Sequence, residues 1–153
     1  MKKFLRKKKN FLKSKTINNL MFNGKKTTGE KIILKFAKFA QKTSNKKFTT
    51  LLQSAIINST PVFSVNTQIV KKGKKKVEKV VPSFLQNHSL RIKSSLLFLK
   101  NAAEKDKKVS SFYKMLAYET IKSSDLEGYS VNKKVEVQKQ VLVNKRYWSK
   151  FKW

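Results

Sequence analysis

The sequence predicts a mainly α-helical single domain of about six helices with one protruding β-hairpin arm and a basic N-terminal tail. Apolar residues recur at helical spacing along most of the chain, as at Phe48, Leu51, Leu52 and Ala55. Residues 60–82 differ, because β-branched residues stand there at near-alternate positions on both sides of a glycine. This pattern is typical of a β-hairpin.

We expect the arm to span residues 62–81, with Pro82 ending its second strand. Its turn region carries Gly73 and a dense group of lysines. These are Lys71, Lys72, Lys74, Lys75 and Lys76. Because neighbouring ammonium groups repel one another, this tip must either stay solvated or bind a dense anion.

Residues 1–15 are predicted to be a basic tail and residues 16–153 the helical domain. The tail has eight basic residues and no acidic residue, which favours a disordered segment that becomes ordered on a phosphate backbone. The alternative is an amphipathic helix on a membrane surface, but four apolar residues offer little area for it. The candidate phosphate ligands are Lys2, Lys3, Lys7, Lys8, Lys9 and Lys13.

The first three helices are predicted from apolar spacing and end signals. A short helix around Ile17 is expected to end at Asn23 and Gly24, a typical left-handed cap. The second helix should start with Thr27 or Thr28 as its N-cap and run to about Gln41. The third should run from Phe48 to near Ser59, because Pro61 follows.

Three further helices are predicted after the arm. One is expected to begin at a cap on Asn87 or Ser89 and to run to about Glu104. The next should span about 110–124, with Gly128 closing the following loop. The last, about 131–149, is assigned as a helix although its valine pairs also resemble a strand.

The charge balance asks for a polyanionic partner. The 153 residues include 37 basic and 8 acidic side chains, a formal net charge of +29. Such self-repulsion disfavours a compact state, whereas nucleic-acid binding releases counterions and gains affinity. An anionic membrane surface is the second option, although no apolar run approaches the length of a membrane span.

The chain lacks the patterns of common enzymes. It has no cysteine and one histidine, His88, and its carboxylates are scattered. General-base chemistry needs an oriented partner group, and no nucleophile elbow, zinc motif or complete phosphate loop is present. We therefore expect no enzymatic activity and no cofactor or metal. The terminal aromatics Trp148, Phe151 and Trp153 either stack on bases or dock the C-terminal helix.

Several segments together resemble the family of ribosomal protein seven of the small subunit. They are NNLMFNGKKTTGEKI, TPVFSV, KNAAEKDKKVSSFYKMLAYET and the terminal SKFKW, in the family's order and spacing from Ile17 to Trp153. The second strand of the arm departs from the family pattern at residues 75–79, and most of the family's arginines are lysines or neutral residues here. A lysine does not replace a bidentate arginine fork, so individual contacts are less transferable.

The resemblance implies a structural protein that binds the 3′ major (head) domain of small-subunit rRNA and organises head assembly. It implies neighbouring ribosomal proteins as partners and an arm pointing toward exit-site tRNA and mRNA. On matching positions, Lys25 and Lys26 would hold phosphates at the second helix start, and Arg91 and Lys93 would face RNA. The lysine and asparagine bias indicates an AT-rich genome, such as an organellar one. The departures from the family pattern favour a mitochondrial branch, with plastids the alternative.

The rival function is an architectural DNA-binding protein with a basic β-arm in the minor groove. Such arms insert apolar or proline wedges, and the tip KKGKKK contains none. A membrane-active cationic protein is a third possibility. It would need a large exposed amphipathic surface, whereas the apolar stripes predicted here have the width expected of helices that pack against each other.

Overall fold

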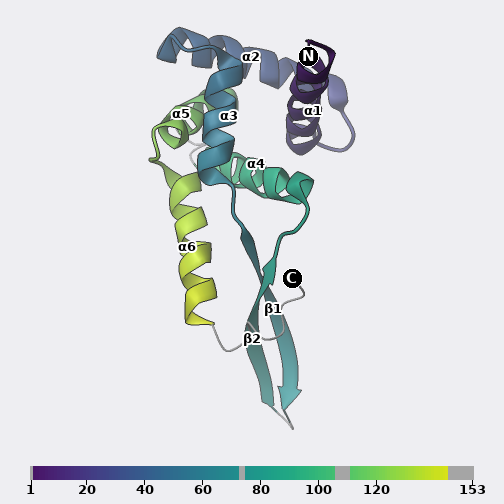
Figure 1. The fold of residues 1–153 in the computed structure, drawn as a ribbon, viewed down its shortest axis with the longest axis vertical. Coiled ribbons are helices and arrows are strands. Elements are labelled where there is room, and N and C mark those ends of the chain that lie inside the picture. The colour runs from purple at the N-terminus through teal and green to yellow at the C-terminus, as the bar shows by residue number, and fades with distance from the viewer. Residues whose placement is uncertain (1, 73–74, 106–110, 145–153) are drawn as a thin grey trace.

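The computed structural model describes residues 2–72, 75–105 and 111–144. In this part of the chain, a helical body carries a two-stranded arm that projects away from it (Figure 1). The elements follow in the order α1 (Lys2–Leu20), α2 (Lys26–Ser44), α3 (Phe48–Ser59), β1 (Phe63–Lys72), β2 (Lys75–Phe84), α4 (His88–Lys105), α5 (Phe112–Ser124) and α6 (Tyr129–Val143). The predicted mainly helical fold with one hairpin is confirmed.

The core lies where the apolar stripes of α1 to α5 meet. Phe36 and Leu99 are each 1% exposed, and the Phe36 ring meets Phe48 edge-to-face with centroids 4.9 Å apart. Burying each large apolar side chain contributes about 1.5–3 kcal/mol, so these stripes hold the body together. The buried cluster consists of Ile17, Leu20, Ile33, Phe36, Ala40, Leu52, Ile56, Ile92, Leu96, Leu99, Ala103, Leu116 and Ala117.

The expectation of a disordered segment over residues 1–15 is wrong, because α1 continues back to Lys2. The sequence contains neither glycine nor proline before Gly24, and lysine and leucine are good helix formers. The core holds the C-terminal part of α1 through Ile17 and Leu20, and helix propensity therefore extends the helix from there toward the N-terminus. The left-handed end of the helix is confirmed by φ angles of 48° at Asn23 and 72° at Gly24.

The predicted cap of α2 is also wrong. Lys25 occupies the N-cap position without a side-chain hydrogen bond, and Thr27 lies inside the first turn. In contrast, the Asn87 cap of α4 is confirmed, because its side-chain oxygen accepts a hydrogen bond of 2.9 Å from the Ser89 backbone N–H. An Asx-type bond of this kind depends on the side chain two residues earlier, which the sequence makes visible.

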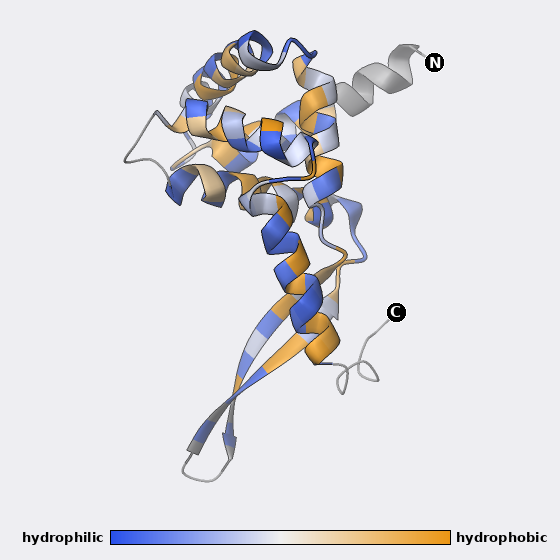
Figure 2. Ribbon diagram, turned by 90° about the vertical axis from the view of Figure 1, so that its left-hand side faces the viewer, coloured by the Kyte–Doolittle hydropathy of each residue, from blue (hydrophilic) through white to orange (hydrophobic). Residues whose placement is uncertain are grey.

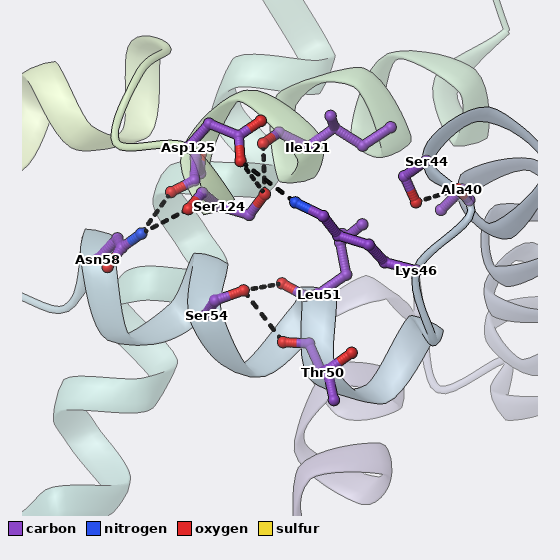
Figure 3. A network of polar contacts seen from close by, with 11 residues as sticks. Ala40, Ser44, Lys46, Thr50, Leu51, Ser54, Asn58, Ile121, Ser124 and Asp125 are labelled. Atoms are coloured by element: carbon purple, nitrogen blue, oxygen red, sulfur yellow. Dashed lines mark hydrogen bonds and ion pairs between the residues drawn. The ribbon is translucent and has the colours of Figure 1, made fainter.

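A polar network joins α3 to the end of α5 (Figure 3). The Asn58 side-chain amide donates hydrogen bonds of 2.9 and 3.0 Å to the carbonyl oxygens of Ser123 and Ser124. Carbonyl groups in the last turn of a helix lack internal partners, so Asn58 satisfies two of them. Lys134 on α6 in turn donates to the Asn58 backbone carbonyl at 2.8 Å, so three helices meet at one residue.

The arm is longer at its base than predicted, because β2 passes through Pro82 and ends at Phe84. Val62 and Leu85 form a hydrogen-bonded pair, with the Leu85 N–H donating to the Val62 carbonyl at 3.0 Å. Pairs alternate along an antiparallel ladder, so Val65 and Pro82 form a non-hydrogen-bonded pair. The Pro82 nitrogen therefore faces away from β1, and the missing N–H costs no ladder bond.

The last described element, α6, is a helix, as predicted, and runs beside the base of the arm (Figure 1). It contacts β1 and thereby links the arm to the body. The helix ends at Val143, and the expected extension to residue 149 lies outside the described residues from 145 onward. Within the described ranges, none of the helices has both the length and the apolarity needed to cross a bilayer.

Candidate nucleic-acid interface

The far end of the arm concentrates lysines on opposite strands. The register places Lys71 opposite Lys76 and Lys72 opposite Lys75. Lys71 and Lys76 are exposed, and by the alternation from Val62 they form a non-hydrogen-bonded pair, where side chains stand closest. Like charges directly opposite destabilise a hairpin, so an anion bound here would relieve a repulsion built into the fold.

The other tip positions are less fully described. Lys72 and Lys75 are placed by their backbone only, and Lys74 lies outside the described residues. Figure 2 shows apolar residues mixed with polar ones in the part of the arm next to the body, and mainly hydrophilic residues toward its far end. The base of the arm is therefore built for packing, as in the Phe63–Phe84 ring contact at 5.8 Å, and the far end for a polar partner.

Internal ion pairing leaves most of the positive charge free for a partner. Even if each of the 8 acidic side chains paired with one basic side chain, 29 of the 37 would remain. Lys133 pairs with Glu136 at 2.8 Å, and this hydrogen bond raises the pKa of Lys133 above its usual 10.5. Lys46 lies 3.6 Å from Asp125 at the surface (Figure 3). Such exposed pairs contribute little and do not alter the field of the whole molecule.

A second group of predicted ligands lies at the turn between α1 and α2. Lys25 and Lys26 are exposed there, at the N-cap and first residue of α2. Lys13 is exposed on α1. The predicted tail ligands Lys2, Lys3, Lys7, Lys8 and Lys9 belong to α1 by their backbone, while their side chains lie outside what the structure describes.

The two predicted ligands on α4 have different surroundings. Lys93 is exposed. Arg91 is half-buried, donates a hydrogen bond from Nε to the Leu85 carbonyl at 2.6 Å, and lies 5.1 Å from the centroid of the Phe84 ring. Arg91 therefore fastens the base of the arm to α4, a role that its place in the sequence did not reveal.

One basic group was missed at the sequence level. Lys31, Lys35, Lys38 and Lys42 follow α2 at spacings of four, three and four residues and are all exposed. This spacing places them on one side of the helix, away from buried Ile33, Phe36 and Ala40. The same period that predicted the apolar stripe could have identified this lysine ridge.

The predicted ligands do not form one compact site. They lie on α1, at the α1–α2 turn, on α4 and at the arm tip, so a partner that meets them all must be extended (Figure 1). His88 is exposed at the start of α4, and within the described ranges no three histidine or carboxylate groups stand together as a metal site would require. The terminal aromatics Trp148, Phe151 and Trp153 lie outside the described residues.

A comparison with known protein families matches residues 2–145 to the family described as Ribosomal protein S7p/S5e. The match covers nearly the whole chain, including both the helical body and the arm. The chain belongs to this family of ribosomal proteins. The resemblance noted in the sequence is thereby confirmed, as is the expectation that the protein is not an enzyme.

Individual relatives carry names from the same family. The small ribosomal subunit protein uS7c of Euglena longa is 30% identical over 142 residues, covering 91% of this chain and 77% of the relative. The uS7 proteins of Dichelobacter nodosus and Pseudothermotoga lettingae are 27% and 29% identical, covering 94% and 89% of this chain and 88% and 84% of theirs. All three relatives are named as small ribosomal subunit proteins, and the DNA-binding alternative finds no support.

Proposed function

We propose that this protein is a structural component of the small ribosomal subunit that binds the 3′ major (head) domain of its rRNA and organises head assembly. The observation that carries the proposal is the arm tip, where lysines face lysines across the ladder in a chain of the S7p/S5e family. A repulsive arrangement of this kind is best balanced by closely spaced phosphates.

Binding is proposed to depend on charge and shape. Double-stranded RNA offers phosphates and 2′-hydroxyls more readily than base edges. The separation of the basic groups suits such a surface, because the arm tip, the α1–α2 turn and the α2 ridge can each meet a different part of a folded RNA. With 34 lysines and 3 arginines, most contacts would be point charges on phosphate and few would be bidentate forks.

The partners are proposed to include neighbouring small-subunit proteins, and the arm is proposed to lie toward exit-site tRNA and mRNA. An arm of two ten-residue strands that projects beyond the body supports this placement, since it can reach past the body's own rRNA contacts (Figure 1). Leu142 and Val143, 53% and 82% exposed at the end of α6, provide apolar surface for a protein neighbour.

The ribosome is proposed to be organellar because of the lysine and asparagine bias. It is proposed to be mitochondrial in particular because residues 75–79 and the arginine positions depart from the family pattern. The relatives include both uS7c of Euglena longa and bacterial uS7 proteins, and none of them is named as a mitochondrial protein. An experiment must therefore distinguish a plastid from a mitochondrial location. Immunodetection in purified organelles should find the protein with mitochondrial ribosomes. Its recovery with plastid ribosomes would contradict the mitochondrial assignment and leave the ribosomal role intact.

The arm-tip contact is tested by replacing Lys71 and Lys76 with alanine and measuring RNA affinity across a salt series. Each lost phosphate contact should reduce the slope of log affinity against log salt by about 0.7–0.9, so the double variant should lose about 1.5. An unchanged slope would show that the arm tip does not bind phosphate.

A matched control removes the same charge elsewhere. Lys46 and Lys133 already pair with Asp125 and Glu136, so replacing both with alanine should change the slope by less than about half a unit. An equal loss of slope in the two double variants would show that only net charge matters and that the arm tip has no special role.

A further inference from the structure

A groove of about 250 Å³ lies beside the turn that joins α1 to α2. Leu20, Ile32 and Phe112 are among the apolar residues that line it, and the basic residues Lys25 and Lys100 line it as well. Its volume is slightly below the usual range of about 300–1,000 Å³ for small-molecule sites, so it suits one flat ring better than a larger ligand.

Phe22, which also lines this groove, is 67% exposed. It is not part of the buried core cluster or of the apolar residues packed against it. The left-handed residues Asn23 and Gly24 follow it directly and hold it at the turn. An exposed phenylalanine in such a position is not explained by the packing of the body.

The surroundings of Phe22 are cationic. The Lys100 ammonium lies 5.1 Å from the centroid of its ring, so a cation already covers part of one ring face. Lys25 is exposed three residues further along the chain, next to exposed Lys26. An aromatic face beside lysines is the combination that single-stranded nucleic acid uses, with the base on the ring and the phosphate on the cations.

We propose that this groove holds one unpaired nucleotide of RNA, with its base stacked on Phe22 and its phosphate at Lys25. The proposal rests on the proposed rRNA-binding function and adds a specific feature of the RNA, a bulged or looped-out base. Glu104 also lines the groove, and its carboxylate repels phosphate. The backbone of the nucleotide is therefore placed on the Lys25 side and the base toward Phe112.

The test compares the full-length chain with its Phe22→Leu variant on two RNA hairpins, one fully paired and one carrying a single-nucleotide bulge. The wild type should prefer the bulged hairpin. Phe22→Leu keeps an apolar side chain but removes the ring, and should weaken bulge binding about 5- to 150-fold, which corresponds to about 1–3 kcal/mol per stacked base. Phe22→Trp should retain the preference, and ultraviolet crosslinking should join the bulged base to residue 22.

Phe11 provides a matched control. It is also exposed, at 45%, and carries Lys15 at 5.5 Å from its ring centroid, but it does not line the groove. Phe11→Leu should leave bulge binding within about twofold, since base stacking depends on the platform ring itself. An equal loss in both variants, or no loss in Phe22→Leu, would overturn the proposal.

Salt dependence separates stacking from charge. Phe22→Leu removes no charge and should lower affinity without changing the salt slope, whereas Lys25→Ala should lower the slope by about 0.7–0.9. If the wild type binds both hairpins equally and with a steep salt slope, only the base site is refuted. If it binds neither hairpin, the proposed rRNA-binding function fails as well.

Discussion

Glu119 on α5 shows how one side chain can join two helices. Its Oε1 atom accepts hydrogen bonds from the Ser130 backbone N–H at 2.7 Å and from the Ser130 hydroxyl at 2.6 Å. Ser130 is fully buried in the first turn of α6, where backbone N–H groups lack internal partners. The carboxylate also complements the positive end of the α6 dipole.

Gly128 is required by the same contact. Its φ angle is +98°, and a Cβ atom at this position would lie 2.9 Å from Glu119 Oε1. A side chain would therefore meet both an unfavourable backbone conformation and the carboxylate. The contact joins residues 11 positions apart across a loop, so periodicity in the sequence could not reveal it.

Replacing Glu119 with alanine should destabilise the protein by about 2 kcal/mol, because hydrogen bonds to a charged group are lost and Ser130 is left buried without them. Urea unfolding followed by circular dichroism measures this change. Glu136→Ala removes the same charge from an exposed pair with Lys133, and should cost no more than about 0.5 kcal/mol. Equal losses in the two variants would mean that net charge, and not the capping contact, determines the effect.

Two helices hold the base of the arm. α6 packs against β1, and α4 contacts the end of β2. Arg91 donates to the Leu85 carbonyl just beyond β2 and covers the Phe84 ring. α6 contacts β1 on the other strand. The direction of the arm relative to the body is thus set by residues outside the strands.

Arg91→Ala should loosen the arm at its base without unfolding the body. Hydrogen exchange at backbone amides near Leu85 and Phe84 should become faster, because the side chain that fixes this segment is gone. Lys93→Ala, on the same helix and exposed, should leave exchange unchanged and reduce the salt slope of RNA binding by up to about 0.9 if it contacts a phosphate. Unchanged hydrogen exchange in Arg91→Ala would show that Arg91 does not fix the base of the arm, and would leave RNA binding as its only proposed role.

Elements with a strong apolar period could be predicted from the sequence. The bounds of α3 and the Asn87 cap of α4 agree with the structure because apolar spacing, a following proline and a local cap are all visible in the chain. The long α1 was missed because its charged turns carry little apolar period and depend on helix propensity. Pro82 was misjudged because whether a strand nitrogen faces its partner depends on register, which the sequence did not fix.

The candidate site divides in the same way. Exposure of Lys13, Lys25, Lys26, Lys71 and Lys76 agrees with a binding role, which itself stays a prediction. The structural role of Arg91 could not be foreseen, because it depends on a ring and a carbonyl brought together by folding. The exposure of Phe22 could not be predicted either, because an apolar residue next to a helix end is normally expected to be buried in the core.

At the scale of the molecule, charge and fold oppose each other. A formal charge of +29 on 153 residues repels itself, while the shared apolar core of α1 to α5 holds the body together. A polyanion that binds only the folded chain relieves the repulsion and stabilises the fold by mass action.

Thermal unfolding should therefore depend on RNA and on salt. RNA at about 100 times its dissociation constant adds about 2.7 kcal/mol, which corresponds to a rise in Tm of about 5–10 °C for a chain of this size. Circular dichroism at the helix signal measures the shift. The same RNA at about 1 M salt should give almost no rise, because phosphate contacts are screened. If RNA at low salt does not raise the Tm, RNA binding does not stabilise the folded chain and the prediction is wrong.

The central claim is that this arm-bearing helical body binds the head of small-subunit rRNA. Crosslinking of the full-length protein in a cell extract, followed by sequencing of the attached RNA, tests it most directly. We expect reads concentrated in the 3′ major domain of small-subunit rRNA, and a specific loss of part of them when Lys71 and Lys76 are replaced with alanine. Reads spread evenly over unrelated RNA, or recovered mainly from DNA, would contradict it.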